Sequence, residues 1–132
     1  MAELSEENLN SLKFNADGLI PAISQQHDTG EILMMAWMNK SSVAETLKTG
    51  VACYWSRSRQ KFWKKGESSG HIQTVKSMRT DCDRDTLLIL VDQAGVACHT
   101  GRHNCFYLEA SEGGWKEIAQ PEVDPEAIYG KK

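Results

Sequence analysis

The stretch Asp81–Cys105, DCDRDTLLILVDQAGVACHTGRHNC, holds most of the residues on which an interpretation of this chain depends. It contains three of the four cysteines, two of the four histidines and three alternating aspartates. Its middle, Thr86–Gln93, is a nearly continuous apolar run, which predicts a buried strand covered on both faces. A turn at Ala94-Gly95 separates this strand from a loop ending at Cys105. Two groups of candidate metal ligands therefore share one short segment.

The first group is the cysteines Cys82, Cys98 and Cys105. Three soft ligands suit a tetrahedral zinc and leave one coordination position open, as in catalytic rather than structural sites. His99 and His103 lie beside the thiols, so a fourth protein ligand stays an alternative. Cysteine is also often just a small buried apolar residue, and the apolar surroundings of Cys53 favour that role for it. The spacing is not Cys-x-x-Cys, so it is only moderately specific for a metal.

The second group is the aspartates Asp81, Asp83 and Asp85. In an extended backbone their side chains share one side, while Cys82 and Arg84 take the other. Three carboxylates on one side repel unless a cation lies between them, and oxygen ligands select Mg²⁺ or Ca²⁺. The run lacks the glycine and the final glutamate of an EF-hand. A solvated acidic turn is the alternative.

Composition indicates one globular domain. The chain has 132 residues, 40% of them hydrophobic and 25% charged, with a net charge of −3. The charge gives no indication of nucleic acid or of a membrane surface as partner. The acidic N-terminus does not resemble a signal peptide, and the longest apolar run, Ile32–Met38, is too short to span a bilayer. We therefore expect a cytoplasmic protein with reduced thiols, which favours metal ligation over disulfides.

The predicted architecture is α+β, with a mainly antiparallel, barrel-like sheet and a few short helices. Ser5 and Asn39 are the expected N-caps of the two helices, and Gly50 the expected end of the second. A hairpin is expected around the turn at 27–30. In chain order the elements are a helix at 5–13, strands at 19–26 and 31–38, a helix at 41–49, and strands at 51–58, 72–80, 86–93 and 105–110. Residues 115–119 could pair again, and 120–132 read as a loose tail.

Residues 54–66, YWSRSRQKFWKKG, combine five cations with four aromatic residues. In an acidic protein this cluster indicates an anion-binding surface whose aromatic rings could stack on a nucleobase. A solvated edge strand, protected from aggregation by its charges, is the alternative. The following loop presents His71, and a lone histidine is more often structural than catalytic.

Four blocks of this sequence closely resemble phosphoribosyl-AMP cyclohydrolases of histidine biosynthesis. The blocks are TGEILMMAWMN, YWSRSRQKFWKKGESSGHIQTV, DCDRDTLLILV and ACHTGRHNCFY. They fall in the family's order and cover roughly residues 17–108. One departure is Asn104, where the family usually has serine, and it lies beside a candidate ligand rather than on one.

The resemblance implies a homodimer, intertwined and sharing its zinc sites, that opens the adenine ring of 1-(5-phosphoribosyl)-AMP. It implies zinc on Cys82, Cys98 and Cys105, the first from the partner subunit, and Mg²⁺ on Asp81, Asp83 and Asp85. We expect residues 1–110 to form the cyclohydrolase domain and 111–132 a loosely ordered extension. The chain is too short for the fused pyrophosphohydrolase of some relatives, so we expect a monofunctional enzyme.

The residues suit this chemistry. Adding water to an aromatic amidine carbon needs a nucleophile stronger than bulk water, and zinc can lower the pKa of a bound water to about 7. His99 is the first candidate to move protons and His71 the second. For the substrate we expect Trp55 to contact the purine and Arg57, Arg59 and Lys64 to contact its two phosphates.

Three other classes were considered. A cytidine-type deaminase needs His-x-Glu and Pro-Cys-x-x-Cys, and neither occurs. A non-catalytic zinc module would need a fourth fixed ligand, His99 or His103. A nucleic-acid binder would rest on residues 54–66 alone, against the negative net charge.

Overall fold

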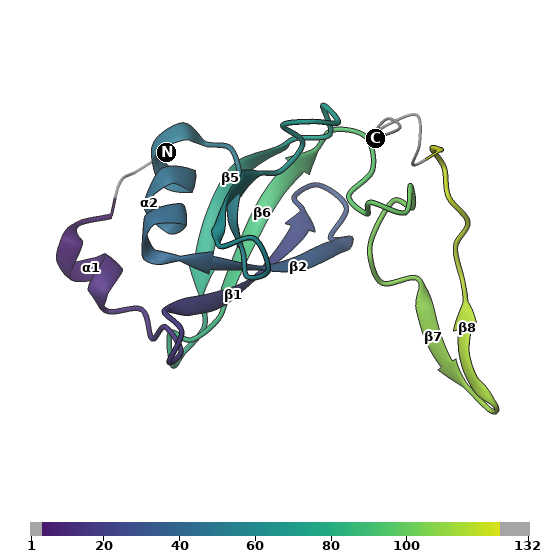
Figure 1. Cartoon of the computed structure of the whole chain (residues 1–132), viewed down its shortest axis with the longest axis horizontal. Helices are drawn as coiled ribbons and strands as arrows, with labels where there is room; N and C mark the ends of the chain where they lie inside the picture. Colours follow the sequence, from purple (N-terminus) through teal and green to yellow (C-terminus); the bar gives the residue numbers. More distant parts are fainter. Residues whose placement is uncertain (1–3, 125–132) are drawn as a thin grey trace.

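Six strands form one curled sheet in the order β4-β3-β2-β1-β6-β5, and two more form a separate hairpin (Figure 1). The structure is a computed structural model that describes residues 4–124. The elements are α1 (Glu6–Asn10), β1 (Leu19–Gln26), β2 (Ile32–Asn39), α2 (Lys40–Thr49), β3 (Cys53–Ser56), β4 (Lys61–Lys64), β5 (Gln73–Thr80), β6 (Leu87–Gln93), β7 (Leu108–Ser111) and β8 (Gly114–Glu117). The predicted α+β class and the single domain are confirmed.

The sheet curls until its two ends nearly meet. The segment just before β3 forms an isolated bridge with the start of β5, between Val51 and Thr74. Ala52 N–H also donates to the Gln73 carbonyl at 3.0 Å. Among the strands of the described residues, β1 and β6 alone pair in parallel, and all other neighbours in this sheet are antiparallel. The expected antiparallel, barrel-like core is therefore present as a half-barrel.

The hydrophobic core fills the inside of this half-barrel. Alternate residues of β1, such as Ile20 and Ala22, point inward and are fully buried. α2 packs against β2 and β3, and Val43 and Leu47 bury its inner face. A polar chain crosses the core: Tyr54 donates to Gln73 at 2.6 Å, and the Gln73 amide donates to Ser24 at 3.1 Å.

Local signals determine the helix ends as expected. Asn39 caps α2 through its side chain, which accepts from Ser42 N–H at 2.8 Å, and Gly50 ends the helix at φ 76°. Ser5 caps α1, but this helix ends at Asn10, so the range 5–13 was too long. The reason is Ser11, whose hydroxyl donates back to the Asn8 carbonyl at 2.6 Å and so ends the helix there.

The prediction that β6 is buried on both faces holds for one face only. Leu87, Ile89 and Val91 are buried, but Leu88 and Leu90 on the other face are only half-buried. No part of residues 4–124 covers this outer face completely. Its apolar surface continues sideways, because Leu88 pairs with Ile23 of β1 and Ile23 pairs with Met35 of β2.

The β7–β8 hairpin stands away from the half-barrel (Figure 1). Every residue of both strands is exposed, and Trp115 is 74% exposed. The expected pairing of 115–119 is confirmed, although the strand predicted at 105–110 begins only at Leu108. Cys105–Tyr107 instead form a loop, because Cys105 N–H is bound by the Leu33 carbonyl at 2.8 Å.

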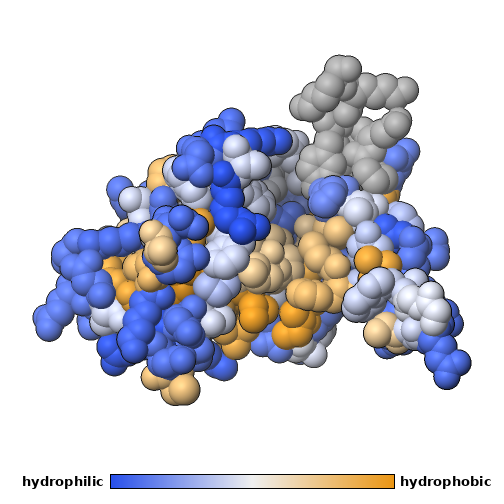
Figure 2. Space-filling model, turned by 60° about the horizontal axis from the view of Figure 1, so that its bottom comes forward, coloured by the Kyte–Doolittle hydropathy of each residue, from blue (hydrophilic) through white to orange (hydrophobic). Residues whose placement is uncertain are grey.

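The chain returns from the hairpin to the half-barrel. Arg102 is buried and binds both the Ala119 carbonyl, at 2.9 Å, and Glu117, at 3.0 Å. Glu122 N–H donates to the Gly101 carbonyl at 2.8 Å. The boundary expected at 110/111 falls inside β7, and residues 125–132 of the expected tail lie outside the described residues. Apolar residues gather on the face between the half-barrel and the hairpin (Figure 2).

Candidate active site

Two of the three candidate zinc ligands meet in the loop after β6. Cys98 is buried and Cys105 half-buried, and Cys98 is close enough to contribute to the raised pKa of Cys105. The loop between them is tight, since Ala97 N–H donates to the His103 carbonyl at 3.0 Å and Cys98 N–H to the Arg102 carbonyl at 3.2 Å. The Thr100 hydroxyl donates to Cys98 Sγ at 3.0 Å. The fold therefore builds a thiol pair from residues seven apart.

Burial keeps the Cys105 thiol protonated in the absence of a cation. It raises the pKa of Cys105 to about 12, with the neighbouring Cys98 acting in the same direction and Lys65 opposing both. A thiol must lose its proton to bind a metal, so metal binding here would release protons.

Cys82 lies far from this pair in the same chain. It is exposed in the turn before β6, whereas Cys98 follows the end of β6 (Figure 1). Seven strand residues span roughly 20 Å. Among the described residues, the three cysteines form no group close enough to hold one ion. One chain therefore does not assemble the predicted three-thiolate site.

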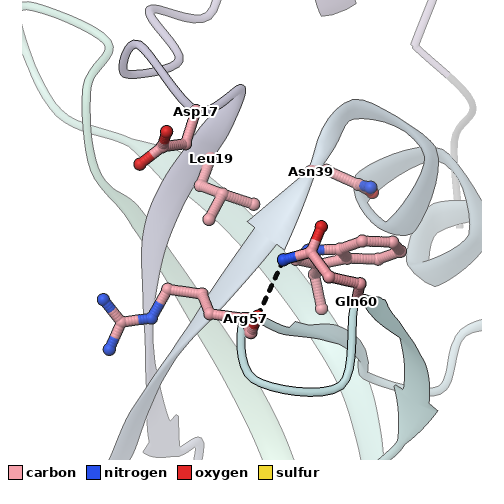
Figure 3. A pocket seen from close by; sticks show the side chains of 6 residues that line it. Asp17, Leu19, Asn39, Arg57 and Gln60 are labelled. Carbon is pink, nitrogen blue, oxygen red and sulfur yellow. Dashed lines mark hydrogen bonds between the residues drawn. The ribbon is translucent and has the colours of Figure 1, made fainter.

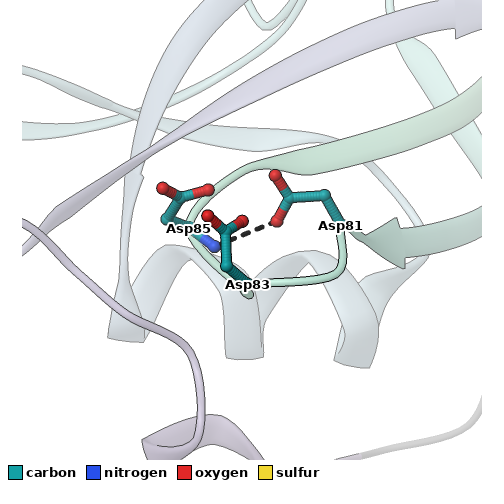
Figure 4. A group of neighbouring side chains, drawn as sticks. All are labelled: Asp81, Asp83 and Asp85. Atoms are coloured by element: carbon teal, nitrogen blue, oxygen red, sulfur yellow. Dashed lines mark hydrogen bonds between the residues drawn. The ribbon is translucent and has the colours of Figure 1, made fainter.

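The three aspartates do converge (Figure 4). One carboxylate oxygen from each of Asp81, Asp83 and Asp85 lies within 4.8 Å of the others, and all three side chains are exposed. The extended geometry expected for this segment is wrong, because residues 82–85 form a turn in which Arg84 has a φ of 61°. The turn gathers the side chains in place of strand alternation, and Asp85 N–H donates to Asp81 at 3.1 Å.

The carboxylates of this acidic turn perturb one another. Hydrogen bonding with Asp83 and then Asp81 raises the pKa of Asp85. Desolvation acts to raise the pKa of Asp81 too, but the hydrogen bonds it accepts from Asp85 and its neighbours outweigh this and lower it. The three carboxylates also repel one another when they are charged, and a bound divalent cation would relieve that repulsion.

His71 is held firmly beside the cysteine loop. Its Nδ1 accepts from Val96 N–H at 3.2 Å, two residues before Cys98. A Cβ at Gly95 would come within 2.8 Å of the imidazole ring, and one at Gly66 within 2.4 Å of the His71 carbonyl carbon. Only glycine permits these approaches, so His71 fixes the path of the loop. The catalytic role predicted for it stays a prediction.

The two histidines within the cysteine loop, His99 and His103, differ in their exposure and in their partners. His99 is exposed next to buried Cys98. His103 Nδ1 lies 2.8 Å from Glu31, whose carboxylate also accepts from the Asn104 side chain at 2.7 Å. Burial acts to raise the pKa of Glu31, but these contacts lower it overall. Glu31 was missed from the sequence because its partner is 72 residues away.

A depression in the surface lies at Trp55 and Arg57 (Figure 3). Its volume is about 410 Å³, and the Arg57 guanidinium lies over the Trp37 ring at 5.0 Å. The Gln60 side chain donates to the Arg57 carbonyl at 2.7 Å, which closes the turn below it. The lining residues not anticipated from the sequence are Asp17, Leu19, Asn39 and Gln60.

The remaining cations of residues 54–66 are divided between surface and interior. Arg59 and Lys64 are exposed and do not line this depression. β4 is an edge strand, the position that the alternative interpretation assigned to it. Lys65 is buried instead, beside Cys98 and Cys105. The alternation of KFWKK offered a signal for this, because Lys65 shares a face with Trp63.

Comparison with known proteins identifies the family. The family model for phosphoribosyl-AMP cyclohydrolase matches residues 34–107, more than half of the chain. The chain belongs to this family. Its members are hydrolases that act on a cyclic amidine, so the chain is an enzyme.

Individual relatives match over nearly the whole length. A phosphoribosyl-AMP cyclohydrolase of Magnetococcus marinus is 73% identical over 94% of this chain and 96% of its own. One of Rhodospirillum centenum is 61% identical over 91% and 90%, and one of Thioalkalivibrio sulfidiphilus 55% identical over 98% and 99%. The resemblance of the four sequence blocks is thereby confirmed. In the described part of the chain no helix has the length and apolar character needed to cross a membrane.

Proposed function

We propose that this chain hydrolyses the N1–C6 bond of the adenine ring in 1-(5-phosphoribosyl)-AMP, a step of histidine biosynthesis in the cytoplasm. Water adds at C6, the C6–N1 bond breaks, N1 takes up a proton and C6 becomes the carboxamide carbon. The product is the phosphoribosyl-formimino-AICAR ribonucleotide. Membership of a family whose relatives carry the name of this activity is the observation that carries the proposal.

Zinc is the proposed cofactor, and the donor set of the thiol pair fits it. The thiols of Cys98 and Cys105 are soft ligands of the kind zinc prefers. When bound, zinc would lower the pKa of a water molecule and so supply a strong nucleophile at neutral pH. Cys82 is the proposed third ligand, and its separation from the pair means that it has to come from a second copy of the chain.

A homodimer also suits the uncovered outer face of the sheet. Ile23, Met35 and Leu88 form a row of apolar side chains across three strands, and Met35 is 43% exposed. A contiguous apolar surface of this kind is typical of an interface. Pairing two such faces would bury both rows and bring elements of two chains together.

The proposed roles of the remaining residues follow from their positions. The acidic turn at Asp81, Asp83 and Asp85 would hold Mg²⁺ through its convergent oxygens. The exposed imidazole of His99 can exchange protons with a substrate bound over Cys98. His71 could do so only through Nε2, since Nδ1 is occupied by Val96.

Substrate binding is assigned to the depression in Figure 3. Trp55 offers a ring for the purine, and Arg57 a guanidinium for a phosphate. Exposed Arg59 and Lys64 would attract the second phosphate without forming part of the depression. Each charge-assisted contact contributes about 1.5–3 kcal/mol, so Arg57→Ala should raise KM roughly 10- to 100-fold.

The function is tested with purified zinc-loaded protein and phosphoribosyl-AMP. Ring opening changes the absorbance of the base, and we expect turnover that disappears on chelation and returns with zinc. AMP, which lacks the ribosyl group on N1, serves as a control that should not react. Absence of turnover by folded, zinc-loaded protein would reject the proposal.

A further inference from the structure

Two opposite charges line the depression in Figure 3 without neutralising each other. Asp17 comes from the turn before β1 and Arg57 from the turn after β3, and both side chains are exposed. Within residues 4–124, no hydrogen bond or ion pair is made to the Asp17 carboxylate, and no carboxylate forms an ion pair with Arg57. Both charged groups are therefore available to a ligand.

Each of the two charges is held by its own part of the fold. Asn15 closes the turn that carries Asp17, because its side chain accepts from Asp17 N–H at 2.9 Å and from Leu19 N–H at 3.0 Å. On the other side of the depression, the Arg57 guanidinium lies over the Trp37 ring, 5.0 Å from its centroid. Such a position over an aromatic face is favourable for a cation. These separate supports keep the carboxylate and the guanidinium apart.

The charges of the lining disfavour a ligand that is only an anion. Of the residues that line the depression, Asp17 is the one acid and Arg57 the one base, so the lining carries no net charge. A phosphate bound to Arg57 would gain a charge-assisted contact but would be repelled by a carboxylate nearby. The carboxylate becomes favourable when the ligand also donates hydrogen bonds, which its two oxygens can accept. A ligand with an anionic end and neighbouring donors fits both groups.

A ribose 5′-phosphate unit has this combination of groups. Its vicinal 2′- and 3′-hydroxyls can donate to the oxygens of one carboxylate, and acidic residues bind ribose hydroxyls in this way in dinucleotide sites. Its phosphate lies at the other end of the sugar. The Trp55 ring lines the same depression and offers a surface for a base. The volume, about 410 Å³, is within the range of roughly 300–1,000 Å³ that is usual for small-molecule sites.

We propose that Asp17 is a specificity-determining residue that binds the ribose diol of the AMP half of the substrate, while Arg57 binds the 5′-phosphate of the same half. The assignment rests on the proposed function, because it takes phosphoribosyl-AMP as the substrate. The second phosphate, on the ribosyl group at N1, is then left to exposed Arg59 and Lys64. The depression distinguishes ribonucleotides from nucleotides that lack the diol.

The test compares binding of AMP with binding of 2′,3′-dideoxy-AMP, which has the same base and phosphate but no diol. Isothermal titration calorimetry with the purified full chain gives both dissociation constants without turnover. We expect wild type to bind AMP roughly 10-fold more tightly, the low end for charge-assisted hydrogen bonds because Asp17 is exposed. In Asp17→Ala the ratio should fall to within about threefold. Both ligands carry one phosphate, so the repulsion that Asp17 exerts on it cancels in the ratio.

Three further variants separate the diol contact from other effects. Arg57→Ala should weaken both ligands by a similar factor and keep the ratio, since it removes a phosphate contact. Asp17→Asn should keep part of the preference, because its amide oxygen can still accept a hydrogen bond, and it replaces Asp17→Ala if that variant does not fold. Glu112→Ala removes an exposed carboxylate at the tip of the β7–β8 hairpin, away from the depression, and should behave as wild type.

The assignment is overturned if Asp17→Ala, or Asp17→Asn in its place, keeps the full wild-type ratio. It is also overturned if wild type binds the dideoxy compound as tightly as AMP, or binds neither ligand at millimolar concentration. None of these results depends on turnover. The proposed function is tested separately, by zinc-dependent hydrolysis of phosphoribosyl-AMP, and can stand when the role of Asp17 fails.

Discussion

The two ends of β6 present candidate metal ligands in contrasting ways. At its end, Cys98 and Cys105 lie in a loop fixed by backbone hydrogen bonds, by His71 and by Glu31, with Lys65 buried beside them. At its start, the acidic turn is exposed, and three carboxylates converge on open solvent. The thiol end is built by packing and the acidic end by local turn geometry alone.

This difference shows what each end requires. For the proposed zinc, the chain offers two candidate thiol ligands, buried Cys98 and half-buried Cys105, in a loop closed by backbone hydrogen bonds. A hard cation can keep part of its water shell, so an exposed turn suffices. Cys82, the third candidate thiol ligand, lies within the acidic turn at the other end of β6. It can join Cys98 and Cys105 only if it comes from a second chain.

The largest expected effect comes from removing one member of the thiol pair. Cys98→Ala or Cys105→Ala should abolish zinc binding and reduce turnover at least roughly a thousandfold, since the Lewis acid supplies several kcal/mol. Zinc content and phosphoribosyl-AMP turnover are measured together. Cys53→Ala, at a buried cysteine away from the pair, is the control and should keep its zinc. Near-normal turnover by a zinc-free variant would contradict the account.

A smaller effect is expected at the acidic turn. Asp83→Asn removes one of three converging charges and should weaken Mg²⁺ binding roughly tenfold, while zinc content stays unchanged. The metal-free variant should be slightly more stable than wild type, because Asp83 raises the pKa of Asp85 through hydrogen bonding and, to a lesser extent, through repulsion between the two carboxylates, and the substitution removes that repulsion. Titration calorimetry with Mg²⁺ and thermal unfolding measure the two effects. Unchanged Mg²⁺ affinity would favour the alternative interpretation, in which residues 81–85 are a solvated acidic turn without a metal.

The smallest effect concerns the support of the thiol loop. Glu31→Gln should lower the free energy of unfolding by about 1 kcal/mol, a modest figure because His103 is 40% exposed and the pair is partly screened. Asp28→Asn, on the same β1–β2 connection, should change stability little. Denaturant unfolding at neutral pH compares the two.

The Glu31 contribution also has a defined pH dependence. The folded pKa of Glu31 lies below its ordinary value of 4.5, so its stabilisation is complete above that pH and is lost as the pH falls through the folded value. Glu31→Gln should therefore differ most from wild type near neutrality and converge with it in acid. A difference that stays constant down to pH 3 would contradict the assignment.

Local chemistry made much of the fold predictable. The cap at Asn39, the glycine at Gly50 and the β1–β2 hairpin depend on neighbours in sequence, and each is present. The acidic turn was predicted as a group of ligands but with the wrong backbone, because the positive φ of Arg84 has no signal in its residue type.

Long-range contacts account for what was missed. Glu31 meets His103 across the fold, and Lys65 reaches the thiols only because the sheet curls. The apolar run of β6 predicted a strand buried on both faces, but its outer face is only half-covered. In the proposed dimer, a second chain would cover this face. Zinc, magnesium and the dimer stay predictions on which the next experiment bears.

The shared site is tested most directly by mixing two inactive proteins. Cys82→Ala and Cys98→Ala chains are each expected to be inactive, and are unfolded and refolded together. Random pairing makes about half of the dimers heterodimers, in which one site carries both lesions and the other none. About a quarter of wild-type turnover should then return, with intact zinc sites in the heterodimer fraction. No recovery, despite heterodimers confirmed by mass, would mean that each site is built within one chain and would contradict the account.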